Sequence, residues 1–100
     1  MKNLNFNWMI ETIGNICEYF SVEQEDLLSR RKDKQTALAR IFAYYILHIN
    51  KGYSVAKVAN VLGRSKRNIQ IQIACLKHNI QHNKEYKGIY EELVKFIHII

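Results

Sequence analysis

A cluster of basic and amide side chains lies between Arg64 and Gln70, where the chain reads Arg-Ser-Lys-Arg-Asn-Ile-Gln. No acidic residue occurs between Asn60 and His82. Lysine and arginine bind phosphate groups, and arginine, asparagine and glutamine hydrogen-bond to base edges in the major groove of DNA. The macrodipole of a helix favours carboxylates in its first turn, so cations at a helix start indicate a partner that carries negative charge.

The residues around this cluster predict two helices joined by a tight turn, between Ser54 and Ile80. Gly63 stands where the end of the first helix commonly requires a left-handed residue. Ser65 is suited to cap the second helix. The apolar stripe of the first helix is Val55, Val58, Ala59 and Leu62, and that of the second is Ile69, Ile73, Leu76 and Ile80. These are the elements of a helix-turn-helix, whose second helix enters the major groove of DNA.

Candidate DNA contacts therefore begin at the turn and continue along the second helix. They are Arg64, Ser65, Lys66, Arg67, Asn68, Gln70 and Ile71. Ile71 breaks the pattern of its helix, because it falls almost opposite the apolar stripe. It is either an incidental exposed apolar residue or a contact to the methyl group of thymine.

A second basic cluster, Arg30-Arg31-Lys32, lies in a polar loop before the most apolar segment of the chain. Such a loop reaches phosphates or a minor groove, where narrow A·T-rich segments attract arginine, although a short charge run is also consistent with solvated surface. We interpret Arg40, in the following helix, as a further phosphate contact. Pairing of Arg40 with a neighbouring carboxylate is the alternative.

The apolar residues recur at helical intervals wherever a pattern is readable, which predicts an all-α fold. With 100 residues, no proline and four glycines, we expect one domain (residues 1–100) of five to six helices. Residues 1–7 are expected to be a frayed start. The first helix should run from Trp8 to about Phe20, with either Met9 or Ile10 on its apolar face.

Three further helices are expected outside the helix-turn-helix. Ser21 is a plausible cap for a short one, Gln24–Leu28. A long helix from about Asp33 to Ile49 is apolar nearly all round, as in a helix buried among others. Its expected core residues are Leu38, Ile41, Phe42, Tyr45 and Ile49. The last helix should begin at Asn83 or Lys84, with Tyr86, Ile89, Tyr90, Leu93, Phe96, Ile97 and Ile100 facing inward.

The composition also bounds the function. The formal net charge is +6 and the pI about 9.4, which favours an anionic partner. Cys17 and Cys75 lack the close spacing of a zinc site and are expected to be reduced and partly buried. The four histidines lack ligand spacing too, and no Ser/His/Asp or Cys/His arrangement indicates catalysis. We therefore expect no enzyme, no metal and no cofactor.

The apolar runs are too short to span a bilayer. We accordingly expect a cytoplasmic protein without a membrane partner, associated with the nucleoid if it binds DNA. The chain contains no glycine-rich phosphate loop with a lysine, so we expect no nucleotide binding and no ATP-driven opening of an origin.

Four short motifs occur in a fixed order along the chain. They are Glu18-Tyr19-Phe20, Asp26-Leu27-Leu28-Ser29, Arg30-Arg31-Lys32 and Ala39-Arg40, with Tyr45 further along. In order and spacing, residues 13–80 resemble the C-terminal DNA-binding domain of the bacterial replication initiator DnaA. The resemblance implies an all-α, Trp-repressor-like fold that contains a helix-turn-helix and binds double-stranded DNA.

The segment that reads bases in that family differs here. The family has a Gly-Gly-Arg-Asp-His-Thr-Thr run, whereas this chain has Gly63-Arg64-Ser65-Lys66-Arg67-Asn68-Ile69, one glycine shorter. We therefore expect the fold to carry over and the target sequence to differ. A transcription regulator or an accessory replication factor fits these features. The alternative is a protein-interaction module that uses the same helical fold to bind an acidic protein, or to form a homodimer through the C-terminal segment Phe96–Ile100.

Overall fold

The computed structural model describes residues 6–30 and 33–99, which form six α-helices and one π-helical turn. The helices are α1 (Phe6–Phe20), α2 (Gln24–Leu28), α3 (Lys34–Tyr45), α4 (Val55–Leu62), α5 (Lys66–His82) and α6 (Lys84–Ile99), and the π-helical turn η1 (Ile46–Asn50) continues α3. The described ranges contain no strand, which confirms the all-α prediction. Helix α1 begins within the segment expected to be frayed, and residues 1–5 of that segment lie outside the described residues.

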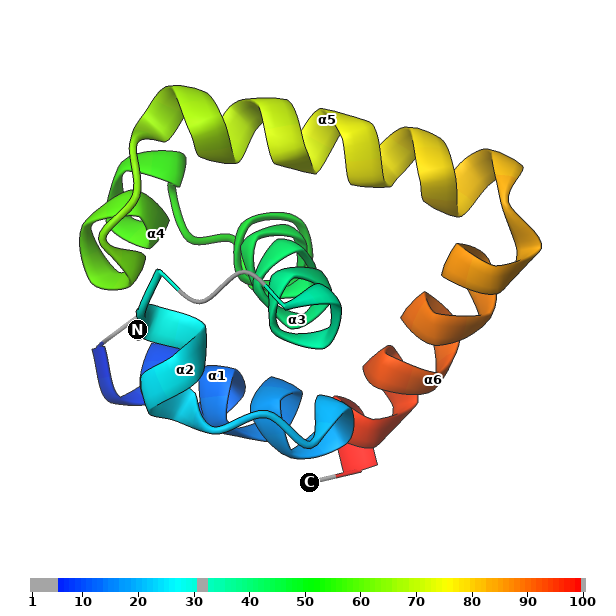
Figure 1. The fold of residues 1–100 in the computed structure, drawn as a ribbon, viewed down its shortest axis with the longest axis horizontal. Helices are drawn as coiled ribbons and strands as arrows, with labels where there is room; N and C mark the ends of the chain where they lie inside the picture. Colours follow the sequence, from blue (N-terminus) through cyan, green and yellow to red (C-terminus); the bar gives the residue numbers. More distant parts are fainter. Residues whose placement is uncertain (1–5, 31–32, 100) are drawn as a thin grey trace.

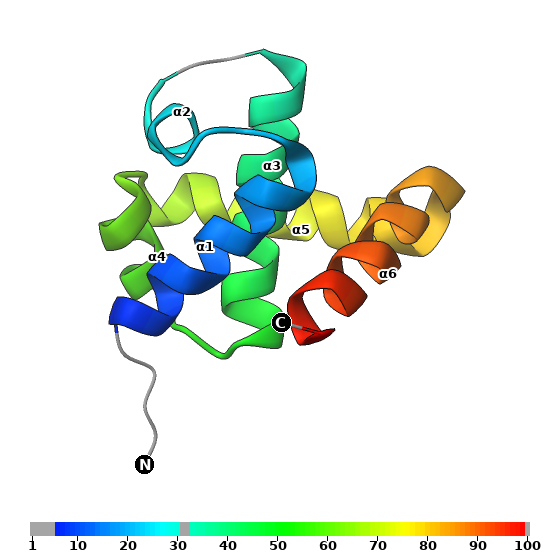
Figure 2. The ribbon, with the colours of Figure 1, turned by 90° about the horizontal axis from the view of Figure 1, so that it is seen from below.

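The other helices surround α3 (Figure 1). Helix α5 lies along one side of it, and α1 and α2 lie along the opposite side. Helix α4 flanks one end of α5, and α6 runs from the other end of α5 back to α1. Turning the view by 90° shows α3 crossing between α1 and α5 (Figure 2). This central position explains why α3 is apolar nearly all round.

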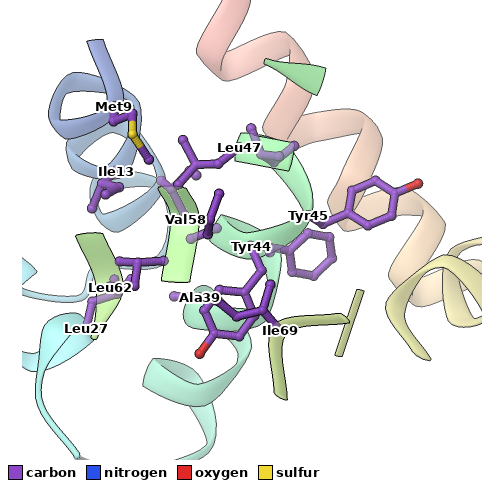
Figure 3. Packing of buried hydrophobic residues seen from close by; sticks show 14 of the residues in the cluster. Met9, Ile13, Leu27, Ala39, Tyr44, Tyr45, Leu47, Val58, Leu62 and Ile69 are labelled. Atoms are coloured by element: carbon purple, nitrogen blue, oxygen red, sulfur yellow. The ribbon is translucent and has the colours of Figure 1, made fainter. Parts of the chain in front are cut away.

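One continuous cluster of buried side chains joins these helices (Figure 3). Met9 and Ile13 of α1 are fully buried, so Met9 rather than Ile10 occupies the apolar face. Tyr44 and Tyr45 point to different sides of α3, and the Tyr45 ring packs edge-on against Tyr90 of α6, with ring centroids 5.5 Å apart. Adjacent residues of α3 thus contact different neighbouring helices. A substitution in α3 therefore affects packing throughout the core.

The expected core residues of the long helix were only partly right. Phe42 and Tyr45 are buried, whereas Leu38 and Ile41 are only partly buried against the core. Ile49 is 48% exposed, so its assignment to the core was wrong.

The π-helical turn η1 explains this error. The amide of Lys51 donates to the carbonyl of Ile46, five residues back, at 3.0 Å. Residues in a π-helical turn rotate less about the axis than α-helical ones, so Ile49 no longer lies on the face that Phe42 and Tyr45 define. Nδ1 of His48, within η1, lies 2.7 Å from the carbonyl oxygen of Tyr53, which follows the turn.

Side-chain caps fix several helix starts. Asp33 accepts hydrogen bonds from the Thr36 amide at 3.1 Å and the Thr36 hydroxyl at 3.0 Å, and thereby caps α3. Asn83 Oδ1 accepts a hydrogen bond from the Glu85 amide at 2.9 Å, at the start of α6. Ser21 does not cap α2, contrary to expectation: it has a left-handed φ of 58°, and Glu23 occupies the cap position.

Helix α6 uses its apolar face inside the domain. Leu93 and Ile97 are buried, and Phe96 packs against Tyr19 of α1 with ring centroids 5.8 Å apart. The Tyr19 hydroxyl donates to Glu92 at 2.6 Å, and burial together with this bond raises the pKa of Tyr19 to about 12. Ile100, also expected to face inward, lies outside the described residues.

Among the described residues, no helix is long and apolar enough to cross a membrane. Both cysteines are free thiols, as expected. Cys17 is buried, which raises its pKa to about 11, but Cys75 is exposed rather than partly buried.

Truncating Phe42 to alanine should lower the free energy of unfolding by about 3–5 kcal/mol, because this fully buried ring leaves a cavity at the centre of the fold. Ile49→Ala, a change at an exposed apolar residue, should alter it by no more than about 0.5 kcal/mol. Urea denaturation followed by circular dichroism measures both. Equal losses in the two variants would contradict the path of the chain through η1.

Candidate nucleic-acid interface

Helices α4 and α5 form the helix-turn-helix, and the turn has the geometry that its sequence predicts. Gly63 ends α4 with a φ of 66°, in the left-handed region. The Arg64 amide donates to the carbonyl of Ala59 at 3.0 Å, as in a glycine-terminated helix. The Ser65 hydroxyl then accepts a hydrogen bond from the Asn68 amide at 3.1 Å and caps α5. Ser65 therefore has a structural role in addition to any contact with DNA.

The outward face of α5 is the most accessible part of the motif. Its exposed residues are Lys66, Arg67, Gln70, Ile71 and Ala74. None of the described helices lies beyond α5 on this side (Figure 1). Ile69, Ile73 and Leu76 are buried on the opposite side, so the helix phase assigned from the sequence is correct.

Ile71 is 49% exposed, which makes it one of the few large apolar side chains open to solvent. It lies one helical turn after Arg67, and the two residues share the outward face. A cation and a small apolar surface are thus presented side by side, which suits guanine acceptors next to a thymine methyl group.

Asn68 lies to the side of this face. With Gln72 of α5, Arg64 of the turn and Tyr44 of α3, it lines a hollow of about 160 Å³ between α3 and the start of α5. Asn68 is only partly exposed. It therefore lies at the edge of the outward face of α5 rather than at its centre.

Arg64 turns back toward the protein. Its Nη2 donates to the carbonyl oxygen of Ser29 at 2.6 Å, in the segment that follows α2. Its Nη1 lies 3.4 Å from the Leu62 carbonyl oxygen and 3.3 Å from that of Gly63. The side chain therefore links the helix-turn-helix to a segment 35 residues away.

Arg40 is only 9% exposed, and its side chain hydrogen-bonds to backbone carbonyl groups, which the sequence did not predict. Nε donates to the Leu27 carbonyl at 2.9 Å, and Nη2 donates to the carbonyls of Asp26 and Ser29, each at 3.1 Å. These bonds bring donors to carbonyl groups at the end of α2, where no further helical turn donates N–H groups to them. The structure thus gives Arg40 internal backbone partners, and its contact with a phosphate stays a prediction.

The two arginines lie close to each other, although each carries a positive charge at neutral pH. Burial, and next the nearby charge of Arg64, lower the pKa of Arg40 from its ordinary value. Burial raises the pKa of Tyr44, and the cations of Arg64 and Arg40 oppose that change.

The basic loop begins directly after Ser29. Arg30 is exposed, whereas Arg31 and Lys32 lie outside the described residues. Asp33, the cap of α3, marks the other end of the loop. The three cations are therefore carried between two anchored positions, Ser29 and Asp33.

Acidic and basic residues are segregated along the chain. The stretch without acidic residues is longer than the one between Asn60 and His82 on which the sequence prediction was based. All nine acidic residues lie in the segments 11–33 and 85–92. No acidic residue occurs from Lys34 to Lys84, which includes α3, α4 and α5, while this span contains nine of the fifteen lysines and arginines. Helices α1, α2 and α6, which contain all but two of the acidic residues, lie on other sides of the domain than the outward face of α5 (Figure 1).

Within the described part of the chain, no three histidine, cysteine or acidic side chains gather in a way that would hold a metal ion. The His78 and His82 rings, one helical turn apart on α5, lie with centroids 4.5 Å apart. His48 lies far from them in sequence, in η1.

Comparison with known proteins identifies the fold. A model of the bacterial DnaA helix-turn-helix matches residues 10–73. The chain belongs to this family. It is also 37% identical over 83 residues to the chromosomal replication initiator protein DnaA of Pseudothermotoga lettingae. That alignment covers 83% of the chain but only 17% of the initiator.

The DnaA helix-turn-helix match ends at residue 73, within α5. It includes α2, the basic loop, α3, α4, the turn and the first half of α5. The rest of α5 and α6 lie beyond it and supply the remaining apolar contacts with α3 and α1.

Gly63→Ala should lower the free energy of unfolding by about 1–2 kcal/mol, because its left-handed φ strains any residue with a Cβ atom. No atom lies within 4 Å of the added Cβ, so crowding adds nothing. Gly88→Ala, at an equally open position inside α6, should instead raise it by about 0.5–1 kcal/mol. Thermal denaturation of the two variants checks these opposite signs, and a stabilised Gly63→Ala variant would contradict the turn geometry.

Proposed function

We propose that this domain binds double-stranded DNA, with α5 in the major groove. The observation that carries the proposal is the outward face of α5, which is exposed, free of acidic residues and basic at its first turn. Membership of the DnaA helix-turn-helix family supports it. A helix-turn-helix inserts the start of its second helix into the groove, where Lys66, Arg67, Gln70 and Ile71 lie.

In this arrangement the contacts divide into two kinds. Lys66 and the loop cations Arg30, Arg31 and Lys32 neutralise backbone phosphates, which supplies most of the affinity and no sequence information. Arg67, Gln70 and Ile71 face the base edges and set the preferred sequence. Asn68 and Ser65, at the flank of the helix start, are placed for the phosphates that border the groove.

The central test is a titration of duplex DNA of random sequence at increasing salt concentrations. Phosphate contacts release bound counterions, so the affinity should fall steeply and log-linearly with salt. Absence of binding even at low salt would refute the proposal and favour a module that grips an acidic protein. Selection of bound duplexes from a random pool then gives the preferred sequence.

We further propose that the domain serves as a transcription regulator or an accessory factor in replication, and therefore acts at the nucleoid. The similar protein from P. lettingae is named a chromosomal replication initiator, but the chain spans 17% of its length. The comparison therefore covers only a small part of such a protein. The base-reading positions differ from the family's run, which supports a target site of its own.

Replacing Arg30, Arg31 and Lys32 together with alanine should weaken binding to all duplexes alike. Each lost phosphate contact should reduce the slope of log affinity against log salt by about 0.9. The measurement is a salt titration on two unrelated duplexes, with Lys51→Ala, a basic residue at the end of η1, as the control. If the triple variant keeps the parent's slope, the loop is solvated surface. A loss confined to one duplex would indicate reading of a minor groove.

Ile71→Ala should relax the preference for thymine at one position of the site, with a loss of about 1–3 kcal/mol on the best duplex. Ile49→Ala removes an equally exposed isoleucine, 48% against 49%, from a different surface and should leave binding unchanged. Binding to a series of duplexes with single base-pair changes measures both effects. Equal behaviour of the two variants would show that Ile71 takes no part in base reading.

A further inference from the structure

The carbonyl oxygen of Ser29 accepts hydrogen bonds from two arginines of different elements. Arg40 Nη2, from α3, lies 3.1 Å away, and Arg64 Nη2, from the helix-turn-helix turn, lies 2.6 Å away. A carbonyl oxygen has two lone pairs, so both guanidinium groups are accommodated at one atom. This atom directly precedes the first cation of the basic loop.

Bringing two like charges together is unfavourable unless other groups compensate. Here the compensation includes carbonyl oxygens at the end of α2 and of α4: those of Asp26 and Leu27 for Arg40, and those of Leu62 and Gly63 for Arg64. Helix ends leave such carbonyls without helical partners, and they carry partial negative charge. The two side chains therefore join the ends of two helices at Ser29.

We propose that Arg40 and Arg64 are positioning residues, which hold Ser29, the residue before the basic loop, at a fixed place relative to the first turn of α5. This inference rests on the proposed function, because it assigns a purpose to the spacing of two DNA-contacting regions. Ser29 is held by the two arginines, and Asp33 at the other end of the loop is held by its bonds to Thr36. Arg30, the first cation of the loop, therefore directly follows a segment that is tied to the turn before Lys66 and Arg67 ahead of any contact with DNA, which lowers the entropy lost on binding.

This role differs from a direct phosphate contact in one measurable way. A phosphate contact depends chiefly on charge, which lysine would retain. A link between Ser29 and the turn depends on the planar fork of arginine, which spans separate carbonyl groups and which a lysine ammonium does not reproduce. Arg64→Lys should therefore behave like Arg64→Gln rather than like the parent.

The first experiment needs no DNA. Hydrogen exchange of the Ser29 amide, which donates to the Asp26 carbonyl at 3.2 Å, reports how firmly this segment is held. In both Arg64→Gln and Arg64→Lys we expect it to become about tenfold faster, as for the loss of a hydrogen bond from a charged donor. The amide of Leu93, inside α6, is the reference for global opening. Arg67→Gln, an exposed change on α5, is the matched control and should leave the Ser29 exchange rate unchanged.

The second experiment combines Arg64→Gln with the alanine triple variant of the loop in duplex titrations. If Arg64 acts through the loop, Arg64→Gln weakens binding by the parent but has little further effect once the loop cations are gone. Independent contacts would instead give fold-changes that multiply to within about twofold.

The outcomes separate the inference from the function on which it rests. Unchanged exchange at Ser29, rescue by lysine, or multiplying fold-changes would each overturn the positioning role. Failure of the parent to bind duplex DNA would refute the proposed function, while the exchange experiment would still decide whether Arg64 holds the start of the loop.

Discussion

The fold depends on the burial of α3 on nearly every side. A helix without a solvated face has to be surrounded by other helices, and here α1, α2, α5 and α6 supply that cover, with the side chains of Tyr44 and Tyr45 directed to different sides. The helix-turn-helix is therefore not an independent unit. Its second helix is set against α3 by Ile69, Ile73 and Leu76, and this contact turns Lys66, Arg67 and Ile71 outward. The same apolar packing that stabilises the domain thus selects the face that we propose binds DNA.

Most of this architecture was predictable because local chemistry agrees with the tertiary arrangement. Gly63 and Ser65 were identified from their positions alone, since a left-handed terminus and a side-chain cap are local requirements that few residue types meet. The outward position of Ile71 followed from helical periodicity in the same way. All three residues occupy the geometry that the sequence predicted.

The errors arose where helical periodicity and residue type carry no signal. The periodicity of α3 gave no sign of the π-helical turn, in which one changed hydrogen-bond register rotates Ile49 into solvent. The internal hydrogen bonds of Arg40 were not predicted either, and a phosphate contact of this residue stays a prediction. Its partners are carbonyls 11 to 14 residues earlier, and nothing in the local pattern marks a backbone acceptor. The link from Arg64 to Ser29, 35 residues away, was hidden for the same reason.

These two arginines also explain how the exposed residues at the start of α5 can differ while the fold of the domain is retained. Of the family's Gly-Gly-Arg-Asp-His-Thr-Thr run, this chain keeps one glycine, Gly63, and the arginine, Arg64. The Arg64 side chain hydrogen-bonds to the backbone of the turn and of Ser29. The residues from Ser65 to Asn68 differ from the run. Apart from the hydrogen bond by which Ser65 caps α5, their side chains make few hydrogen bonds within the described part of the domain. Replacing a residue that hydrogen-bonds to several backbone carbonyl groups lowers the stability of the fold, because each carbonyl group loses a hydrogen bond. Replacing an exposed residue changes the stability little. Structural constraint therefore ends close to Arg64, and the residues that we propose to face DNA can differ without loss of the fold.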